Sequence, residues 1–153
     1  MANYRPLRDY EDVCVFSKGN ATPKASNIMT YNPQGLIITN KKKIRKGGMG
    51  IHTDRDSQLG EYVSKGTNYP RSVLEFDMDK DTWHPTQKPV ALFEYMVKTY
   101  TNENEVVLDN TAGSCTTAIA SKNTNRKWIC IEKEEKYCDL SVERLQKWSN
   151  SGF

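Results

Sequence analysis

The sequence predicts an α/β fold, and three features of its second half support that prediction. Residues 106–108 form a short apolar run that ends in the acid Asp109, after which a turn of small residues opens a helical pattern. A second apolar run, residues 128–131, ends in the acid Glu132. A strand, a helix and a second strand in this order form a βαβ unit, whose parallel strands end at the same edge of the sheet.

Length and composition are those of one folded domain. The chain has 153 residues, of which 37% are hydrophobic and 10% aromatic, enough to bury a core. No apolar run is long enough to cross a bilayer and residues 1–8 lack an apolar signal region, so we expect a cytoplasmic protein with no membrane partner. Four cysteines without CxxC spacing predict reduced thiols instead of a disulfide framework or a zinc site: Cys14, Cys115, Cys130 and Cys138.

The net charge of +3 is unevenly distributed. Residues 1–71 contain 12 Lys/Arg and 6 Asp/Glu, a balance of +6, whereas residues 72–153 contain 10 and 13, a balance of −3. A basic half beside an acidic half indicates that one part of the chain meets a polyanion.

The first half is predicted to contain little regular structure. Residues 11–17 are β-rich and alternate valine with other apolar side chains, which predicts a buried strand, and residues 35–39 predict a second short strand. Because polar residues and glycines dominate the remainder, we expect residues 18–71 to be largely irregular. Residues 72–76 are a third candidate strand.

The second half is predicted to alternate helices with the strands at residues 106–109 and 128–131. Residues 116–122 predict a short helix between those strands. A helix over residues 89–100, with its proline in the first turn, has an apolar face of Leu92, Tyr95, Met96 and Thr99. The last helix, over residues 134–148, has a core-facing stripe of Tyr137, Leu140, Ser141, Arg144, Leu145 and Trp148.

The turn after Asp109 and the acid Glu132 together predict a ligand site. Small residues let the backbone approach a ligand, and the amides at a helix N-terminus bind carboxylate or phosphate groups. Glu132 follows Asp109 by 23 positions, near the spacing of about 20 at which an acid binds ribose hydroxyls, so an adenosine-containing cofactor is expected. A single glycine, Gly113, disfavours NAD. Two alternatives stay open, an ordinary strand–turn–helix junction and a helix-capping role for Glu132.

Residues 83–89 concentrate side chains with special properties between two prolines that stiffen the backbone. Lys88 is a compact cation suited to a carboxylate, and Thr86 and Gln87 offer directional hydrogen bonds. The alternative is a helix entry in which Thr86 and Gln87 act only as caps, and a lone histidine such as His84 is more often structural than catalytic.

Residues 41–46 concentrate positive charge. Five cations in six positions predict a phosphate-binding surface. The alternative is a solvated strand face, whereas three nearby glycines favour a loop that moulds to a partner. The candidate DNA-binding residues are Lys41, Lys42, Lys43, Arg45 and Lys46.

These motifs, in this order, resemble those of one family. Residues 84–89, His-Pro-Thr-Gln-Lys-Pro, are similar to its cofactor-proximal element, and residues 107–117 are similar to its S-adenosylmethionine loop. Glu132 and the helix after it resemble the ribose-binding acid and its helix, and residues 5–18 resemble the segment closing the catalytic half. The chain therefore resembles the C-terminal part of a DNA amino-methyltransferase of the circularly permuted class, in which the catalytic half comes first. Phage-encoded adenine enzymes are the most similar.

The resemblance implies a partial Rossmann-like sheet with an irregular basic insertion. It divides the chain into the end of the catalytic half (1–17), a DNA-recognition segment (18–80) and a cofactor-binding part (81–153). It implies methylation of double-stranded DNA at adenine N6, in restriction–modification, with N4 of cytosine as the alternative. S-adenosylmethionine is then expected to contact Thr86, Gln87, Lys88, Asp109, Thr111, Gly113, Ser114, Thr116 and Glu132.

Two features depart from the family pattern. Cys115 stands where the family usually has glycine, so we expect its side chain to crowd the methionine end of the cofactor and weaken binding. No Pro-Pro dipeptide occurs anywhere in the chain. The family's catalytic element, Asp/Asn/Ser-Pro-Pro-Tyr/Phe, holds and stacks the flipped base, and the permuted order would place it before residue 1.

The absence of the Pro-Pro dipeptide leads to expectations about activity and partners. We expect no catalytic residue in this chain and no DNA methylation by the chain alone. An unpaired strand edge favours a second polypeptide carrying the catalytic half, or self-association. A protein of a different class, a non-catalytic remnant that binds only DNA or cofactor, is the other alternative.

Overall fold

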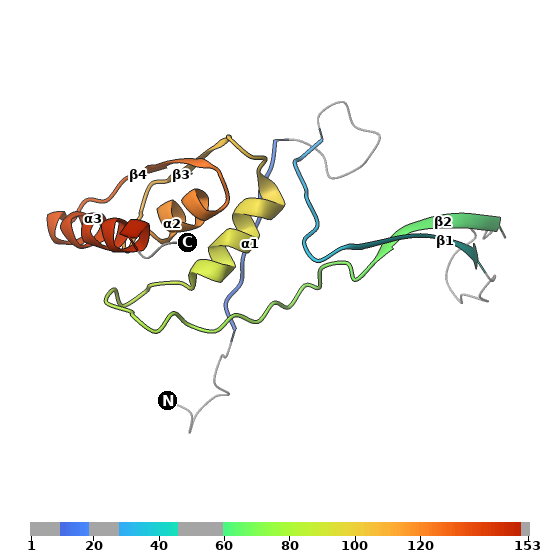
Figure 1. Cartoon of the computed structure of the whole chain (residues 1–153), viewed down its shortest axis with the longest axis horizontal. Coiled ribbons are helices and arrows are strands. Elements are labelled where there is room, and N and C mark those ends of the chain that lie inside the picture. The colour runs from blue at the N-terminus through green and yellow to red at the C-terminus, as the bar shows by residue number, and fades with distance from the viewer. Residues whose placement is uncertain (1–9, 19–27, 46–59, 151–153) are drawn as a thin grey trace, which may run out of the picture.

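The computed structural model of the chain describes residues 10–18, 28–45 and 60–150. A body of three helices and a parallel strand pair carries a two-stranded antiparallel ribbon that projects away from it (Figure 1). None of the described helices has the length and apolar content needed to span a membrane. In chain order the elements are β1 (Ile37–Arg45), β2 (Gly60–Thr67), α1 (Val90–Tyr100), β3 (Val106–Asp109), α2 (Thr116–Asn123), β4 (Lys127–Cys130) and α3 (Glu135–Asn150).

The body is built around the predicted βαβ unit. β3 pairs with β4 in parallel, with Val106 opposite Lys127 and Asp109 opposite Cys130. α2 connects the two strands and packs against α1, and its Ile119 is fully buried. The predicted strands and helices of the second half are confirmed to within about two residues, so both strand-end acids lie at one edge of the sheet.

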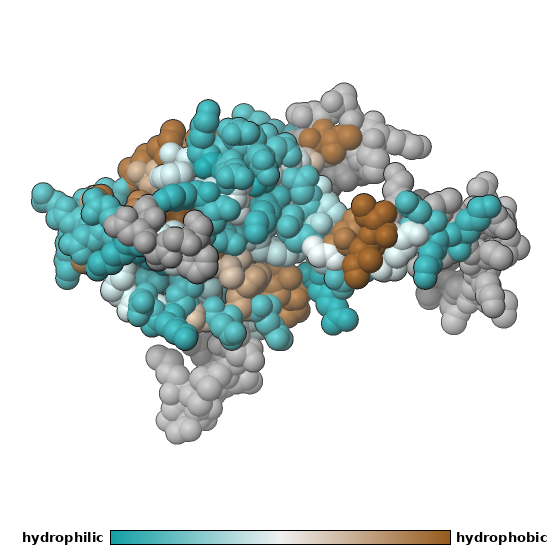
Figure 2. Space-filling model, viewed as in Figure 1, coloured by the Kyte–Doolittle hydropathy of each residue, from teal (hydrophilic) through white to brown (hydrophobic). Residues whose placement is uncertain are grey.

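All three helices lie on the same side of the β3–β4 sheet (Figure 1). No described element covers the opposite face, where apolar side chains of both strands remain more than half exposed. Figure 2 shows apolar surface over this part of the body. The side chains are Val106 (55% exposed), Leu108 (62%), Ile129 (53%) and Ile131 (53%), and we call them the bare face. A parallel pair with helices on one side is the partial Rossmann-like arrangement that was expected.

α3 packs its predicted stripe toward the body. Ser141 is buried and Arg144, Leu145 and Trp148 are partly buried, as the 3.6-residue period requires. Trp148 Nε1 donates a 3.0 Å hydrogen bond to Asn123 Oδ1 at the end of α2. The four cysteines are free thiols in this structure.

Two predicted strands are wrong. Residues 11–17 are extended without strand pairing, and Val13 and Phe16 are 58% and 89% exposed instead of buried. Residues 72–76 also form no strand, and Val73 is 72% exposed. A strand forms only where its backbone makes a ladder of hydrogen bonds with a second strand, and neither segment forms such a ladder within the described residues.

The expected irregularity of residues 18–71 is also wrong for the described ribbon. β1 pairs antiparallel with β2, from Ile37 opposite Thr67 to Arg45 opposite Gly60. The register shifts between Ile38 and Lys41, where Asn40 adopts a positive φ of 45°. Backbone pairing between segments distant in sequence stabilises these polar strands. Irregular structure was predicted because residues 18–71 lack a local apolar pattern, and that pattern does not report such pairing.

Candidate functional site

A cavity of about 580 Å³ opens at the carboxyl end of β3, within the size range of small-molecule sites. Two of the predicted motifs line it, together with an apolar wall from α1 and from residues 14–16. Of the predicted cofactor residues, the lining includes Thr86, Lys88, Asp109, Thr111, Gly113, Ser114 and Thr116, but neither Gln87 nor Glu132.

Asp109 holds the turn that follows β3. One carboxylate oxygen accepts a 3.1 Å hydrogen bond from the amide of Thr111, and the other accepts a hydrogen bond from the hydroxyl of Thr117, in the first turn of α2. The strand-end acid therefore connects the start and the end of the loop. In this structure the Asp109 carboxylate holds the loop in its conformation.

Gly113 occupies a position that other residues would strain. Its φ is +50°, and a Cβ added there would lie 3.2 Å from the imidazole ring of His84. That ring packs edge-on against Tyr137, with centroids 4.4 Å apart, so it has little room to retreat. Ser141 Oγ donates a 3.0 Å hydrogen bond to the carbonyl of Gly113, which further fixes the loop against α3.

Glu132 joins the two strand-end turns. Its Oε2 accepts a 2.7 Å hydrogen bond from the amide of Gly113, and its Oε1 accepts bonds from the amides of Lys133 (2.9 Å) and Glu134 (3.0 Å). These amides lower the pKa of the Glu132 carboxyl, that of Glu134 most strongly. Glu132 thus has the capping role at the turn into α3. A carboxylate offers about four acceptor positions, so capacity for a ligand hydroxyl remains.

Residues 84–88 lie over the loop, as expected from their pairing in the sequence. The amide of Thr86 donates to Nδ1 of His84 at 3.3 Å, and Thr116 Oγ1 donates to the carbonyl of Lys88 at 3.3 Å. The Lys88 ammonium lies 2.8 Å from a carboxylate oxygen of Glu11. Gln87 has a different role: its buried side chain donates a 3.1 Å bond to the carbonyl of Asp81.

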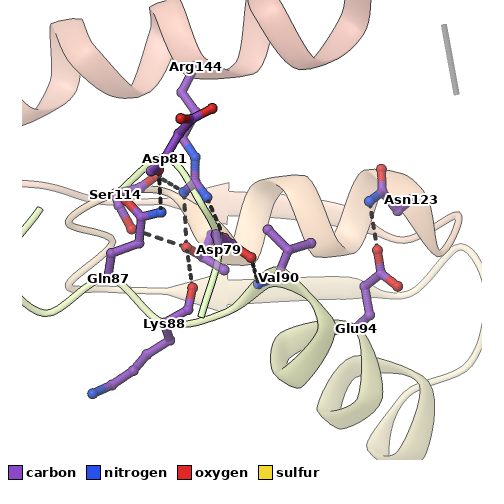
Figure 3. A network of polar contacts seen from close by, with 10 residues as sticks. Asp79, Asp81, Gln87, Lys88, Val90, Glu94, Ser114, Asn123 and Arg144 are labelled. Atoms are coloured by element: carbon purple, nitrogen blue, oxygen red, sulfur yellow. Dashed lines mark hydrogen bonds and ion pairs between the residues drawn. The ribbon is translucent and has the colours of Figure 1, made fainter. Parts of the chain in front are cut away.

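Arg144 is the centre of a polar network that the apolar stripe of α3 did not predict (Figure 3). Its guanidinium donates to the carbonyl of Ser114 at 2.8 Å and to Thr116 Oγ1 at 3.0 Å, and pairs with Asp79 at 3.2 Å. Asp79 also accepts a 3.2 Å bond from the amide of Val90 at the start of α1. Burial lowers the pKa of Arg144, and the Asp79 carboxylate opposes that shift. A charged residue at a core-facing position was the signal for this network.

The expected crowding by Cys115 is wrong. Cys115 has left-handed backbone angles, φ 54° and ψ 32°, and is 8% exposed. Its side chain belongs to a small core with Ala112 and Ala118, against which Cys130 and Leu145 pack, and it does not line the cavity. The left-handed conformation directs the Cβ into the body, so the loop keeps a backbone surface toward the cavity.

Several residues that line the cavity were not predicted. His84 and Thr117 come from the recognised motifs, but their roles follow from packing against Gly113 and from bonding to Asp109. The apolar wall comes from α1 and the N-terminal segment, and its members include Phe16, Phe93, Met96, Val97 and Tyr100. Of the α1 residues among these, only Met96 was on the face that the helical period predicted.

Residues 41–45 of the basic run lie on the ribbon, which projects away from the body (Figure 1). Lys41 and Lys42 are exposed and occupy adjacent positions in β1, so they point to opposite faces. Lys43 and Arg45 belong to the same strand, and Lys46 lies outside the described residues. The expectation of a loop is therefore wrong for residues 41–45.

Comparisons with known proteins agree with these motifs. The DNA methylase family of the N6/N4 type matches residues 1–143. The chain is 38% identical over 155 residues to the type II methyltransferase M.HindIII of Haemophilus influenzae, covering 100% of this chain and 45% of that protein. It is 37% identical over 122 residues to the DNA adenine methyltransferase YhdJ of Escherichia coli, covering 80% and 42%.

Among solved structures, the M1.HpyAVI–SAM complex aligns with 60% of this chain and 42% of its own, at 35% identity and a TM-score of 0.44. The chain spans about half the length, or less, of the curated relatives it matches.

Proposed function

The chain belongs to the N6/N4 DNA methylase family, and from that premise we propose that it is the cofactor-binding part of an S-adenosylmethionine-dependent DNA methyltransferase. The observation that carries the proposal is the cavity, where residues 84–88 and the loop after β3 meet. The division proposed for the chain is the end of a catalytic half (1–17), DNA recognition (18–80) and cofactor binding (81–153).

The residues around the cavity fit S-adenosylmethionine. Gly113 lines the cavity without a side chain of its own, Lys88 is suited to a carboxylate, and the wall from α1 is suited to an apolar ring. Glu132 keeps acceptor capacity for a ribose hydroxyl next to the Gly113 amide. When bound, the cofactor supplies an electrophilic methyl group. The residues of this chain bind and orient it.

For DNA, the proposal assigns the ribbon. A two-stranded antiparallel ribbon fits the major groove of B-form DNA, and β1 presents exposed cations at Lys41 and Lys42. Phosphate contacts by such residues position a protein on the duplex without reading its sequence. Lys43, Arg45 and Lys46 complete the proposed cationic surface.

The proposed target is adenine N6. The supporting observation is the similarity to the adenine enzyme YhdJ over 80% of this chain. N4 of cytosine, the alternative, is an outcome that product analysis distinguishes.

The chain alone is proposed to be inactive. The supporting observation is that the sequence contains no Pro-Pro dipeptide, which the family's base-binding catalytic element carries. Within the described residues, the bare face and the edge of β3 that β4 does not pair support docking of a second polypeptide that carries a catalytic half, or self-association.

The test is transfer of labelled methyl groups from S-adenosylmethionine to duplex DNA, with nucleoside analysis of the product. The chain alone should give no product, and the chain mixed with a Pro-Pro-Tyr-bearing half of a relative should give N6-methyladenine. Robust turnover by the chain alone would contradict the proposed division of labour. Binding of DNA or cofactor without turnover in either mixture would favour the remnant.

A further inference from the structure

The lysine assigned to the cofactor already holds a carboxylate of this chain. Both carboxylate oxygens of Glu11 lie 2.8 Å from the Lys88 ammonium, although the two residues are 77 positions apart in the sequence. The Lys88 side chain points away from the network around Arg144, whereas its carbonyl takes part in that network (Figure 3). The N-terminal segment and residues 84–88 therefore meet through this ion pair.

The ion pair lies where a ligand carboxylate would bind. Lys88 is the only lysine or arginine among the described residues that line the cavity, and Asp109 contributes an acid to the same lining. A carboxylate in the cavity is repelled by Asp109 and attracted by Lys88. It therefore needs the same ammonium that Glu11 contacts.

One ammonium does not accommodate both carboxylates well. It has three N–H donors, and Glu11 places both of its oxygens within hydrogen-bond distance of them. A second carboxylate at Lys88 would lie beside the first, and two carboxylates that share a site repel each other. A ligand carboxylate and Glu11 therefore compete for Lys88.

The segment that carries Glu11 lies at the edge of the cavity and is exposed. Cys14, Val15 and Phe16 belong to the cavity lining, and the segment is extended without strand pairing within the described residues. The Glu11 side chain is 73% exposed and that of Lys88 is 37% exposed. Ion pairs as exposed as this one are weak, so another carboxylate can replace Glu11.

We propose that Glu11 is an internal competitor for the carboxylate of S-adenosylmethionine. Glu11 pairs with Lys88 in the free chain and is displaced when the cofactor binds. This inference rests on the proposed function, because it assigns the cofactor's carboxylate to Lys88. The apparent affinity falls with the fraction of molecules in which Lys88 is occupied. Glu11 thus weakens the binding of ligands that carry this carboxylate and not of ligands that lack it.

The experiment is calorimetric titration of the whole chain with S-adenosylmethionine and with decarboxylated S-adenosylmethionine. Both ligands carry a net positive charge, so loss of an acid from the protein would by itself weaken their binding. For S-adenosylmethionine we expect the opposite: Glu11→Gln should bind it about two- to fivefold more tightly, the range that an exposed ion pair supports. The decarboxylated ligand should bind Glu11→Gln no more tightly than wild type.

Two controls isolate the contact with Lys88. Glu143→Gln removes the same charge from another exposed glutamate–lysine pair, with Lys147 at 4.0 Å on α3, and should bind S-adenosylmethionine as wild type does. In a Lys88→Met background, Glu11→Gln should no longer tighten binding, because the ammonium for which the two carboxylates compete is gone.

Three results would overturn the proposal while leaving the proposed function in place. They are equal or weaker binding of S-adenosylmethionine by Glu11→Gln, tighter binding of both ligands by that variant, and a gain that persists in the Lys88→Met background. Binding of neither ligand by wild type would overturn the proposed function, and this inference with it.

Discussion

The amide of Gly113 donates a 2.7 Å hydrogen bond to the carboxylate of Glu132, and this contact joins the turns that follow the two parallel strands. The acid that the sequence predicts as a ligand for ribose is the cap that holds the loop in this structure. Any ligand that uses Glu132 meets a carboxylate already oriented by three backbone amides, which is a preorganised arrangement.

Replacement of Glu132 should change how stability depends on pH. Its folded pKa lies below 4.5, the ordinary value for a glutamate. The stabilisation is therefore present above about pH 4.5 and is lost as pH falls through the lower folded pKa. Urea midpoints measured from neutral to acidic pH should fall less steeply for Glu132→Gln than for wild type. Some dependence of stability on pH should remain in that variant, because the pKa of Glu105 is also lowered. If the urea midpoints of the two proteins fall in parallel with pH, the amide contacts of Glu132 do not contribute to the pH dependence of stability.

Gly113→Ala should destabilise the fold by about 1–3 kcal/mol, from the positive φ and the close approach of the His84 ring. Urea denaturation gives the free energy of unfolding. In a His84→Ala background the same substitution should cost less, because the ring is gone while the φ is unchanged. An equal cost in both backgrounds would mean that the ring does not confine this position.

Cys115→Gly should be at least as stable as Cys115→Ala, although it removes one more carbon atom from the core. Alanine retains the left-handed strain at φ 54°, which costs about 1 kcal/mol, and glycine relieves it. Both variants lose the packing of the thiol. Thermal and urea denaturation of the two variants measures the difference in stability. A clearly more stable alanine variant would argue against the left-handed conformation of residue 115.

The bare face should drive association of the isolated chain. Replacing Leu108 and Ile129 together with Gln removes exposed apolar surface, and we expect lower sedimentation-derived mass at high concentration with stability changed by less than about 1 kcal/mol. The control is Val142→Gln, on α3, where the side chain is 54% exposed. If that control lowers the sedimentation-derived mass equally, association depends on the total exposed apolar surface and not on the bare face.

DNA binding by the ribbon should depend steeply on salt. Lys41→Ala combined with Lys42→Ala should reduce the slope of log affinity against log salt by about two units, because each phosphate that a lysine neutralises adds nearly one unit. The matched control replaces Lys133 and Lys136, which are exposed on the body. Fluorescence anisotropy with a labelled duplex measures both slopes. An unchanged slope for the ribbon variant would make these lysines a solvated strand face.

Local pattern was enough to predict the second half of the fold. The period of α1 and α3 and the apolar runs of β3 and β4 are properties of contiguous residues, and the structure confirms these elements, although the buried Val97 lies off the face that the period of α1 predicted. The β1–β2 ribbon depends on pairing between residues far apart in sequence, and beyond the short strand predicted at residues 35–39, which overlaps the start of β1, its polar composition gives no local signal. Residues 11–17 show the opposite error, because a strand-like local pattern does not by itself provide the second strand with which a ladder is formed.

The site shows the same division. The two motifs that line the cavity could be recognised from residue types and order. The direction of the Cys115 side chain could not, since it follows from one left-handed residue that turns the Cβ toward β4. The network of Arg144 with Asp79 and Ser114 likewise depends on how three separate segments pack.

The central claim is that S-adenosylmethionine binds in the cavity at the end of β3, and calorimetric titration tests it most directly. Wild type should bind, and Lys88→Met should bind more weakly by about 1 kcal/mol, since the ammonium is partly exposed. Lys98→Met, a lysine of α1 that does not line the cavity, should bind as wild type does. Absence of binding to wild type at millimolar cofactor, or equal losses in both variants, would contradict the account.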